Sequence, residues 1–368
     1  MIDTNEFLNT LTEYGFDFYT GVPDSLLKNL CAGISSSVKL SNITAANEGN
    51  AVSLACGYYL SSGKPAVVYM QNSGIGNAVN PLLSLADEDV YSIPFLMIVG
   101  WRGEPGTSDE PQHKKQGKLT IPLFETMGIP TVVLENDYRK CIEECAEYME
   151  KYSRPIALVI RKNTFSDIPF SKGENNFSLS REESLEIITE HLSENDIIVS
   201  TTGKTSRELF EIRERRHQSH RCDFLTVGSM GHTSSIALGI SLGTDKTVYC
   251  ADGDGSFLMH MGSAAVNSVN MGENFRYIVL NNGAHESVGG QQTVGFDVNI
   301  PEILAACGFS EVFSVKTADE LHEVIEKMKK TPKSAMVIFI KQGSRNNLGR
   351  PLLSPQENKK IFMENLIK

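Results

Sequence analysis

Residues 247–256, Thr-Val-Tyr-Cys-Ala-Asp-Gly-Asp-Gly-Ser, and residues 277–282, Tyr-Ile-Val-Leu-Asn-Asn, decide the fold class of this chain. Each stretch begins as an apolar run typical of a buried strand and ends in polar residues. The segment 263–269 between them has helical spacing of small and apolar residues, which predicts two parallel neighbouring strands joined by a helix. The polar ends are therefore expected at the carboxyl edge of one sheet, where open α/β sheets bind ligands.

These polar ends predict a metal and phosphate site. Asp254 and Asn282 supply hard oxygen ligands and leave coordination positions open, which suits a Mg²⁺ ion that also holds a diphosphate. Gly253 and Gly255 let the backbone approach phosphate oxygens, and the N-terminus of the following helix favours negative charge. Gly-Asp-Gly alone, or Asn-Asn-Gly alone, is a common turn. The signal is specific because both occur at the ends of neighbouring strands.

Together the two stretches resemble the Gly-Asp-Gly…Asn-Asn motif of the thiamin diphosphate (ThDP)-dependent decarboxylase superfamily. The resemblance implies that Asp254, Asn282 and the backbone carbonyl of Ala284 bind Mg²⁺. It also implies that the turn at 228–232 lies against the cofactor, with Met230 supporting its bent conformation; a flexible core methionine is the alternative. The cofactor-binding residues expected in this half of the chain are Gly228, Met230, Gly253, Asp254, Gly255, Ser256, Asn282 and Ala284.

The first half of the chain is expected to supply the rest of the cofactor site. Residues 46–51, Ala-Asn-Glu-Gly-Asn-Ala, resemble the superfamily segment that carries an essential glutamate. The resemblance implies that Glu48 hydrogen-bonds N1′ of the aminopyrimidine, although a glutamate in a first helical turn is otherwise a favourable dipole partner. Asn72 and Ser73 follow a predicted strand and are expected to reach the pyrimidine.

A dinucleotide cofactor is a rival suggested by Gly-Ile-Gly at 74–76. However, Val79 occupies the third glycine position of that fingerprint. The next predicted strand, at 93–99, is not followed by an acidic ribose ligand. Both departures argue against NAD.

Composition bounds the class of protein. The 368 residues suffice for two domains with full cores. A formal net charge of −11 argues against nucleic-acid or membrane-surface partners. We find no apolar run of the roughly 20 residues that span a bilayer and no signal-peptide pattern. The seven scattered cysteines are expected to be reduced. These features favour a cytoplasmic enzyme.

The order of predicted elements indicates two domains. Strands alternate with helices in both halves, which predicts two doubly wound α/β domains with mainly parallel sheets. We assign a pyrimidine-type domain to residues 1–165 and a diphosphate-type domain to residues 181–368. Residues 166–180 are expected to form a linker too short to hold the middle domain of larger ThDP decarboxylases. Residues 101–118 are expected to form a polar loop, and whether this loop closes over the substrate stays open.

Among two-domain members, the chain resembles the phosphonopyruvate decarboxylase family, and the sulfopyruvate decarboxylases are a close sister. The resemblance implies a lyase that converts 3-phosphonopyruvate to 2-phosphonoacetaldehyde and CO₂, a step of phosphonate biosynthesis. Sulfopyruvate decarboxylation, a ThDP-dependent carboligation and a non-catalytic binding role stay open as alternatives. The motifs that carry this resemblance are Gly-Val-Pro-Asp-Ser at 21–25, Gly-Trp-Arg-Gly at 100–103, Asp-Glu-Pro-Gln-His at 109–113 and His-Glu-Ser-Val-Gly-Gly-Gln at 285–291.

Several polar residues are candidates for contact with a small anionic 2-oxo acid substrate. Proton transfer near neutral pH favours the histidines His113 and His285. The resemblance places a substrate-side polar group at the turn that holds Asp24 and Ser25. An anionic phosphonate requires cations and N–H donors. The cationic candidates are Arg102, Lys114, Lys115, Arg345 and Arg350.

Self-association is the last expectation. In this superfamily the two halves of each site come from different subunits. The resemblance therefore implies that Glu48 of one chain meets Asp254 and Asn282 of another. A dimer is then the smallest active unit, and trimers or tetramers stay open.

Overall fold

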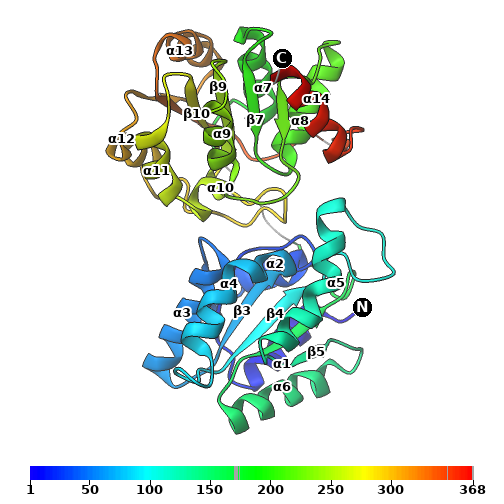
Figure 1. The fold of residues 1–368 in the computed structure, drawn as a ribbon. Helices are drawn as coiled ribbons and strands as arrows, with labels where there is room; N and C mark the ends of the chain where they lie inside the picture. Colours follow the sequence, from blue (N-terminus) through cyan, green and yellow to red (C-terminus); the bar gives the residue numbers. More distant parts are fainter. Residues whose placement is uncertain (170–172, 174, 346, 367–368) are drawn as a thin grey trace. The chain divides into compact units, whose positions relative to one another are not determined.

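The computed structural model describes residues 1–169, 173, 175–345 and 347–366, which form two compact units (Figure 1). The first unit comprises residues 1–172 together with 288–291. The second comprises residues 173–287 together with 292–368. Each unit is a parallel sheet with helices on both of its faces.

The first unit contains a six-stranded sheet in the order β2-β1-β3-β4-β6-β5, and every pairing is parallel. Its strands are β1 (Phe18–Gly21), β2 (Ser41–Thr44), β3 (Ala66–Gln71), β4 (Phe95–Gly100), β5 (Thr131–Val133) and β6 (Ile156–Ile160). Its helices are α1 (Thr4–Glu13), α2 (Lys28–Ser36), α3 (Glu48–Ser62), η1 (Asn72–Gly74), α4 (Ile75–Pro81), η2 (Leu82–Ala86), α5 (Pro111–Thr126) and α6 (Tyr138–Tyr152).

Two apolar cores lie on opposite faces of this sheet. Neighbouring strand residues alternate between the cores, as Val67 and Val68 of β3 do. Helices α1, α2 and α6 pack on the face that carries Val67. Helices α3, α4 and α5 pack on the face that carries Val68. The central strands are buried on both sides, which explains their continuous apolar sequence.

The second unit contains a parallel sheet in the order β11-β12-β10-β9-β7-β8. Its strands are β7 (Ile197–Ser200), β8 (Asp223–Leu225), β9 (Val248–Gly253), β10 (Phe275–Asn281), β11 (Val312–Val315) and β12 (Ser334–Phe339). Its helices are α7 (Arg181–His191), α8 (Lys204–Arg215), α9 (Thr233–Ser241), α10 (Asp254–Met259), α11 (Gly262–Asn270), α12 (Ile300–Cys307), α13 (Ala318–Lys330) and α14 (Pro355–Leu366).

The two sheets have the same topology. With strands counted from the start of each unit, both run 2-1-3-4-6-5. The order therefore reverses between β1 and β3 in the first unit and between β7 and β9 in the second. Loops at the carboxyl ends of such strands form the ligand crevice of doubly wound folds. The predicted fold class, two doubly wound parallel-sheet domains, is confirmed.

One local prediction is wrong. Residues 101–118 do not form a single polar loop, because helix α5 begins at Pro111. Gly117 and Pro122 lie inside this helix, and both residue types have low helix propensity, so the sequence pattern does not predict it. A Cβ on Gly117 would lie 1.7 Å from the carbonyl oxygen of Gly103, so glycine allows the helix to dock against the backbone there. Only residues 101–110 remain as a loop.

The segment predicted as a linker, 166–180, has described residues that pack on the unit to which each belongs. Ser166 accepts a hydrogen bond from the Thr4 hydroxyl through its carbonyl. Phe177 packs against the rings of Phe296 and Phe339 in the second unit. Residues 170–172 and 174 of the segment lie outside the described residues.

Two further properties concern the whole described chain. In the described ranges, none of the helices combines the length and apolarity needed to cross a membrane. All seven cysteines are free thiols, and six of them are buried. The thiols therefore contribute to packing rather than to cross-links.

Candidate active site

Glu48 begins helix α3 at the carboxyl edge of the first sheet. The Asn47 side chain caps this helix by accepting from the Asn50 amide. The Glu48 side chain is 5% exposed, and its Oε2 accepts a hydrogen bond of 2.7 Å from Asn77 Nδ2. A Cβ on Gly74 would lie 2.2 Å from Glu48 Oε1, so this glycine makes room for the carboxylate. Glu48 is thus a buried carboxylate of fixed orientation.

Asp24 and Ser25 follow β1 and lie beside Arg102, which follows β4. Ser25 Oγ accepts from Arg102 Nη1 at 2.7 Å. Arg102 Nε and Nη2 donate to the two carboxyl oxygens of Asp109 at 2.8 and 2.6 Å. The fork-to-carboxylate geometry holds the guanidinium firmly and directs one donor at Ser25.

Asp24 is fully buried, and neither of its carboxyl oxygens has a hydrogen-bond partner among the described residues. Burial raises the pKa of Asp24 to about 6, while the charge of Arg102 and the nearby backbone amides of Leu26, Leu27 and Ser25 oppose that rise. Unsatisfied buried carboxyl oxygens are rare in folded proteins and require an explanation. Their place at the predicted substrate turn supplies one.

His113 lies on the first turn of α5, with 8% of its surface exposed. Its Nδ1 has no hydrogen-bond partner among the described residues. Burial, and then the positive charge of Arg102, lower the pKa of His113 to about 4. The imidazole is therefore neutral at pH 7. The structure brings Asp24, Ser25, Arg102 and His113 into one neighbourhood. Their contacts with a substrate stay a prediction.

Asn72 and Ser73 lie in η1, immediately after β3. Asn72 is 1% exposed, and its Nδ2 donates to the Arg102 carbonyl at 2.8 Å and to Thr120 Oγ1 at 2.9 Å. The side chain therefore fixes the start of the 101–110 loop against α5. Ser73 Oγ accepts from Gln71 Nε2. The reach of these two side chains toward a pyrimidine stays a prediction.

Asp254 begins α10 at the carboxyl end of β9 and is 2% exposed. Its Oδ2 accepts from the Thr293 hydroxyl. Burial raises the pKa of Asp254 to about 6, while hydrogen bonds from Thr293 and from backbone amides lower it. No cationic side chain forms an ion pair with Asp254 in the described part of the chain.

Asn282 directly follows β10, and both ends of its carboxamide are engaged. Its Nδ2 donates to Glu286 Oε2 at 2.9 Å, and its Oδ1 accepts from the Ala284 amide at 3.0 Å. Burial would raise the pKa of Glu286, but Arg181, Ser344 and Lys204 lower it to about 2. Glu286 is therefore ionised at neutral pH. Asn282 and Ala284 are both buried.

Met230 and His285 both lie close to Gly255. A Cβ on Gly255 would lie 3.0 Å from the His285 ring and 3.3 Å from Met230 Cε. Ser256 Oγ accepts from the Gly231 amide at 3.0 Å, which ties the turn at 228–232 to α10. Burial lowers the pKa of His285 to about 4. Met230, predicted to support the cofactor, and His285, predicted to transfer protons, thus lie beside the start of α10.

Gly228 lies in the same turn, two residues before Met230. The Thr202 hydroxyl donates to the neighbouring carbonyl of Val227 at 2.7 Å and holds the turn beside β7. Gly253 is the last residue of β9, so the backbone before Asp254 is part of the sheet. These bonds place the turn and the helix start at the same edge.

The other predicted cations differ in surroundings. Lys114 and Lys115 are exposed on α5, one and two residues after His113. Arg345 forms ion pairs with Glu182 and Glu211 in the second unit, so two carboxylates balance its charge. Arg350 lies in an irregular segment before α14. Arg102 is the candidate that adjoins the other predicted substrate residues.

Sequence reasoning missed several residues that shape the site. Asn77 and Thr293 orient the two key carboxylates, and Asp109 anchors Arg102. Glu286 was quoted only as part of a motif, and Arg181 carries no local signal of a role. Only their contacts in the folded chain reveal these roles, and several of those contacts join residues far apart in sequence.

The second unit has the donors expected for Mg²⁺ and a diphosphate. A carboxylate, a carboxamide and a backbone carbonyl are hard oxygen ligands of the kind that Mg²⁺ accepts. The buried Asp254 carboxylate lacks a cationic partner within the described residues, and a divalent ion would supply that charge. The backbone amides at the start of α10 suit an anion. The residues present fit the group.

Known proteins resemble this chain over nearly its full length. The model of the thiamine pyrophosphate enzyme N-terminal TPP-binding domain matches residues 4–121, and that of the C-terminal TPP-binding domain matches residues 201–339. Phosphonopyruvate decarboxylases of Streptomyces hygroscopicus and Streptomyces viridochromogenes are 32% and 31% identical to it. These matches cover 99% and 98% of this chain and 94% of each relative.

A sulfopyruvate decarboxylase of Methanosarcina acetivorans is 29% identical over 98% of this chain and 96% of its own length. The described helices and strands of residues 122–200, between the two domain matches, all belong to one of the two α/β units, so the described chain contains no middle domain. Domain matches and full-length relatives agree on one group of enzymes. The chain belongs to the family of thiamine diphosphate-dependent decarboxylases that includes phosphonopyruvate decarboxylase.

Proposed function

We propose that this protein is a Mg²⁺- and ThDP-dependent lyase that decarboxylates 3-phosphonopyruvate to 2-phosphonoacetaldehyde and CO₂. The observation that carries the proposal is full-length similarity to two phosphonopyruvate decarboxylases, in a chain that keeps Glu48, Asp254 and Asn282 in buried, oriented positions. A phosphonate-producing cell would use the aldehyde in phosphonate biosynthesis.

In this proposal the protein positions the cofactor and controls protons around it. When bound, ThDP supplies a carbon nucleophile and an electron sink for decarboxylation. Asp254, Asn282 and the Ala284 carbonyl would hold Mg²⁺, and the turns at 228–232 and 253–256 would hold the diphosphate. Glu48 would exchange a proton with the bound pyrimidine ring, and Asn77 keeps the carboxylate in a fixed orientation.

Residues of the first unit hold the substrate. Arg102 is firmly paired with Asp109 and directs Nη1 toward Ser25, so this edge offers N–H and O–H donors to an anionic group. His113 is neutral at pH 7 and has an unpartnered Nδ1, so it can accept a proton or a hydrogen bond without first losing a proton. The free carboxyl oxygens of Asp24 lie in the same neighbourhood.

We further propose that two chains complete each site. The residues of the pyrimidine half belong to the first unit and those of the diphosphate half to the second. In a dimer, Glu48 of one subunit would serve the Mg²⁺ site of the other. We place this enzyme in the cytoplasm, in keeping with its free thiols.

The deciding experiment measures CO₂ release from phosphonopyruvate, sulfopyruvate and pyruvate by purified protein with Mg²⁺ and ThDP. Preference for phosphonopyruvate, lost when ThDP is omitted, supports the proposal. Preference for sulfopyruvate would leave the decarboxylation mechanism unchanged and replace the proposed substrate with the one in the name of the Methanosarcina relative. If no acid releases CO₂ while ThDP binds, the decarboxylase proposal fails, and assays for carboligation come next.

A further inference from the structure

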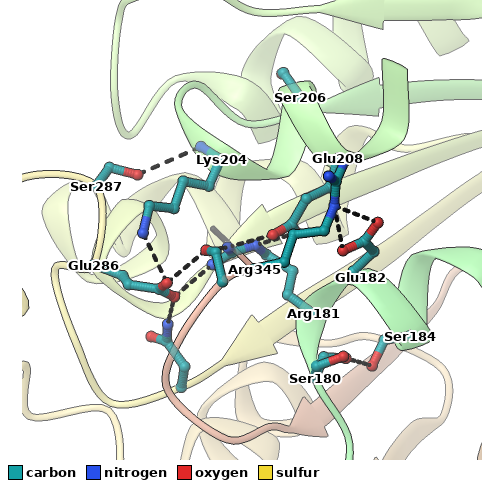
Figure 2. Close-up of polar contacts among 12 residues, drawn as sticks. Ser180, Arg181, Glu182, Ser184, Lys204, Ser206, Glu208, Glu286, Ser287 and Arg345 are labelled. Carbon is teal, nitrogen blue, oxygen red and sulfur yellow. Dashed lines mark hydrogen bonds and ion pairs between the residues drawn. The ribbon is translucent and has the colours of Figure 1, made fainter. Parts of the chain in front are cut away.

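Glu286 lies at the centre of a buried polar cluster in the second unit (Figure 2). Its Oε1 accepts from Lys204 Nζ at 2.9 Å and from Ser344 Oγ at 2.6 Å. Its Oε2 accepts from Arg181 Nη1 and from Asn282 Nδ2, both at 2.9 Å. The Glu286 side chain is 5% exposed, so these four donors replace nearly all of its hydration.

The donors come from separate parts of the second unit. Arg181 is the first residue of α7, Lys204 is the first residue of α8, and Ser344 follows β12. Arg181 also forms a bidentate pair with Glu208 at 2.7 and 2.8 Å, and its Nη2 donates to Ser344 at 2.8 Å. Glu286 is therefore held from three directions and has little freedom to rotate.

The charges in this cluster balance. Two cations, Arg181 and Lys204, face two carboxylates, Glu286 and Glu208. Removal of one member of such a buried set leaves an uncompensated charge. Stability alone does not explain why one carboxylate of the cluster also holds the side chain of Asn282, because the two cations and Ser344 already engage both of its oxygens.

A carboxylate accepts hydrogen bonds and donates none, so only the NH₂ end of the Asn282 carboxamide can face Glu286. The oxygen must then point the other way, where it accepts from the Ala284 amide and keeps a second lone pair free. Metal coordination requires this oxygen, because the amide nitrogen has no lone pair to give.

We propose that Glu286 is a positioning residue that sets which end of the Asn282 carboxamide faces the Mg²⁺ site. Arg181, Lys204 and Ser344 hold it in place for that purpose. The inference rests on the Mg²⁺ site of the proposed function. Partners that orient metal ligands typically contribute about 10- to 100-fold to metal affinity.

The test measures the Kd of Mg²⁺ by calorimetric titration of protein with saturating ThDP. For the native protein, binding tests the proposed site itself. We expect Glu286→Ala to raise the Kd about 10- to 100-fold. Glu286→Gln should have a smaller effect, because its amide oxygen can still accept from Asn282. A folded Glu286→Ala protein that binds Mg²⁺ with native affinity would overturn the inference.

Glu182→Gln is the matched control. Glu182 adjoins Arg181 in sequence and pairs with Arg215 and Arg345, but it has no bond to Asn282 or Glu286 among its described contacts. The same loss of charge should leave the Kd of Mg²⁺ within about twofold of the native value, as is usual for partly exposed pairs. An equal weakening in this control would show that the effect is a general electrostatic one and would contradict the proposal.

A rescue experiment separates orientation from simple destabilisation. In Asn282→Asp, both ends of the side chain are oxygens, so orientation no longer matters, but two carboxylates then face each other. Adding Glu286→Gln replaces that repulsion with an amide donor. We expect the double variant to bind Mg²⁺ more tightly than either single variant. Binding no tighter than that of the tighter-binding single variant would refute the positioning role.

If Glu286→Ala does not fold, Ser344→Ala serves in its place. It removes one donor to Glu286 and leaves both ion pairs. A Kd raised severalfold, with an unfolding temperature within a few degrees of native, is expected, and an unchanged Kd would count against the proposal.

Discussion

The two units share one strand order, but the residues predicted to form their sites differ in hydrogen bonding. At the edge of the first unit, both carboxyl oxygens of Asp24 and Nδ1 of His113 lack partners within the described chain. At the edge of the second, Asp254 bonds to Thr293, and Asn282 bonds to Glu286 at one end and to Ala284 at the other. The residues predicted to contact substrate in the first unit thus include unpartnered groups, whereas the side chains predicted to hold Mg²⁺ in the second unit are hydrogen-bonded.

The difference follows from what each half is proposed to do. A buried polar group without a partner destabilises the fold by about 1 to 3 kcal/mol. Such a group is tolerated where a substrate or proton will later meet it. A cofactor anchor has the opposite requirement, because its ligands must already be oriented before the metal binds. The comparison supports the proposed division, in which the first unit carries turnover and the second retains the cofactor.

The sharpest way to break this assignment is Glu48→Gln. The variant should lose about 10³- to 10⁴-fold in kcat, because the side chain can no longer exchange a proton. ThDP affinity should stay near native, since the amide preserves volume and polarity. Steady-state CO₂ release and calorimetric ThDP titration give the two readouts. Full activity in this variant would remove the first unit from the chemistry.

The mirror experiment in the second unit is Asp254→Asn. We expect the Kd of Mg²⁺ to rise about 10²- to 10³-fold, more than the loss of an orienting partner produces. Saturating Mg²⁺ should restore most of kcat, because the residues of the first unit are untouched. Titration of activity and of binding with Mg²⁺ measures both. A fall in kcat that no Mg²⁺ concentration relieves would mean that Asp254 also acts in turnover.

The smallest expected effect is the contribution of Asp24 to the pH dependence of the unfolding free energy. The pKa of Asp24 is about 6 in the folded protein and 3.8 when unperturbed, so folding strengthens proton binding. Its contribution to stability is present in full below pH 4 and is lost as the pH rises through 6, by about 3 kcal/mol in total. Asp24→Asn lacks this dependence.

The measurement compares the unfolding free energy of the native protein and of Asp24→Asn at pH 4.5 and pH 7. Relative to native, the variant should gain stability on going to the higher pH. Titrating groups of the second unit are common to both proteins and cancel in the difference. Parallel pH profiles of the two proteins would show that Asp24 is satisfied in solution.

Much of the fold was predictable because its signals are local. Buried strands are continuous apolar runs, and the motif around Asp254 and Asn282 marks where two of them end. The N-cap residue Asn47 indicates the start of helix α3. Helix α5 was not predictable, because Gly117 and Pro122 are helix breakers by intrinsic propensity. A tertiary contact between Gly117 and Gly103 overrides that propensity.

The site was predictable in part for the same reason. Glu48, Asp254 and Asn282 occur in short motifs whose spacing predicts a role in cofactor binding. The residues that orient them have no such motif role. Glu286 depends on Arg181 and Ser344, which lie far from it in sequence and carry no pattern of their own. Such long-range hydrogen bonds become visible only in three dimensions.

The backbone contact between Gly117 and Gly103 has a consequence for how this enzyme can change. His113, Gly117 and Thr120 lie on the buried face of α5. The backbone contact between Gly117 and Gly103 therefore fixes the position of this helix and, with it, the position of His113. The solvent face of the helix, with Lys114 and Lys115, takes no part in that docking. Substitutions there can change the local charge while His113 stays where it is. The position of His113 and the charge around it are therefore determined by different faces of the same helix.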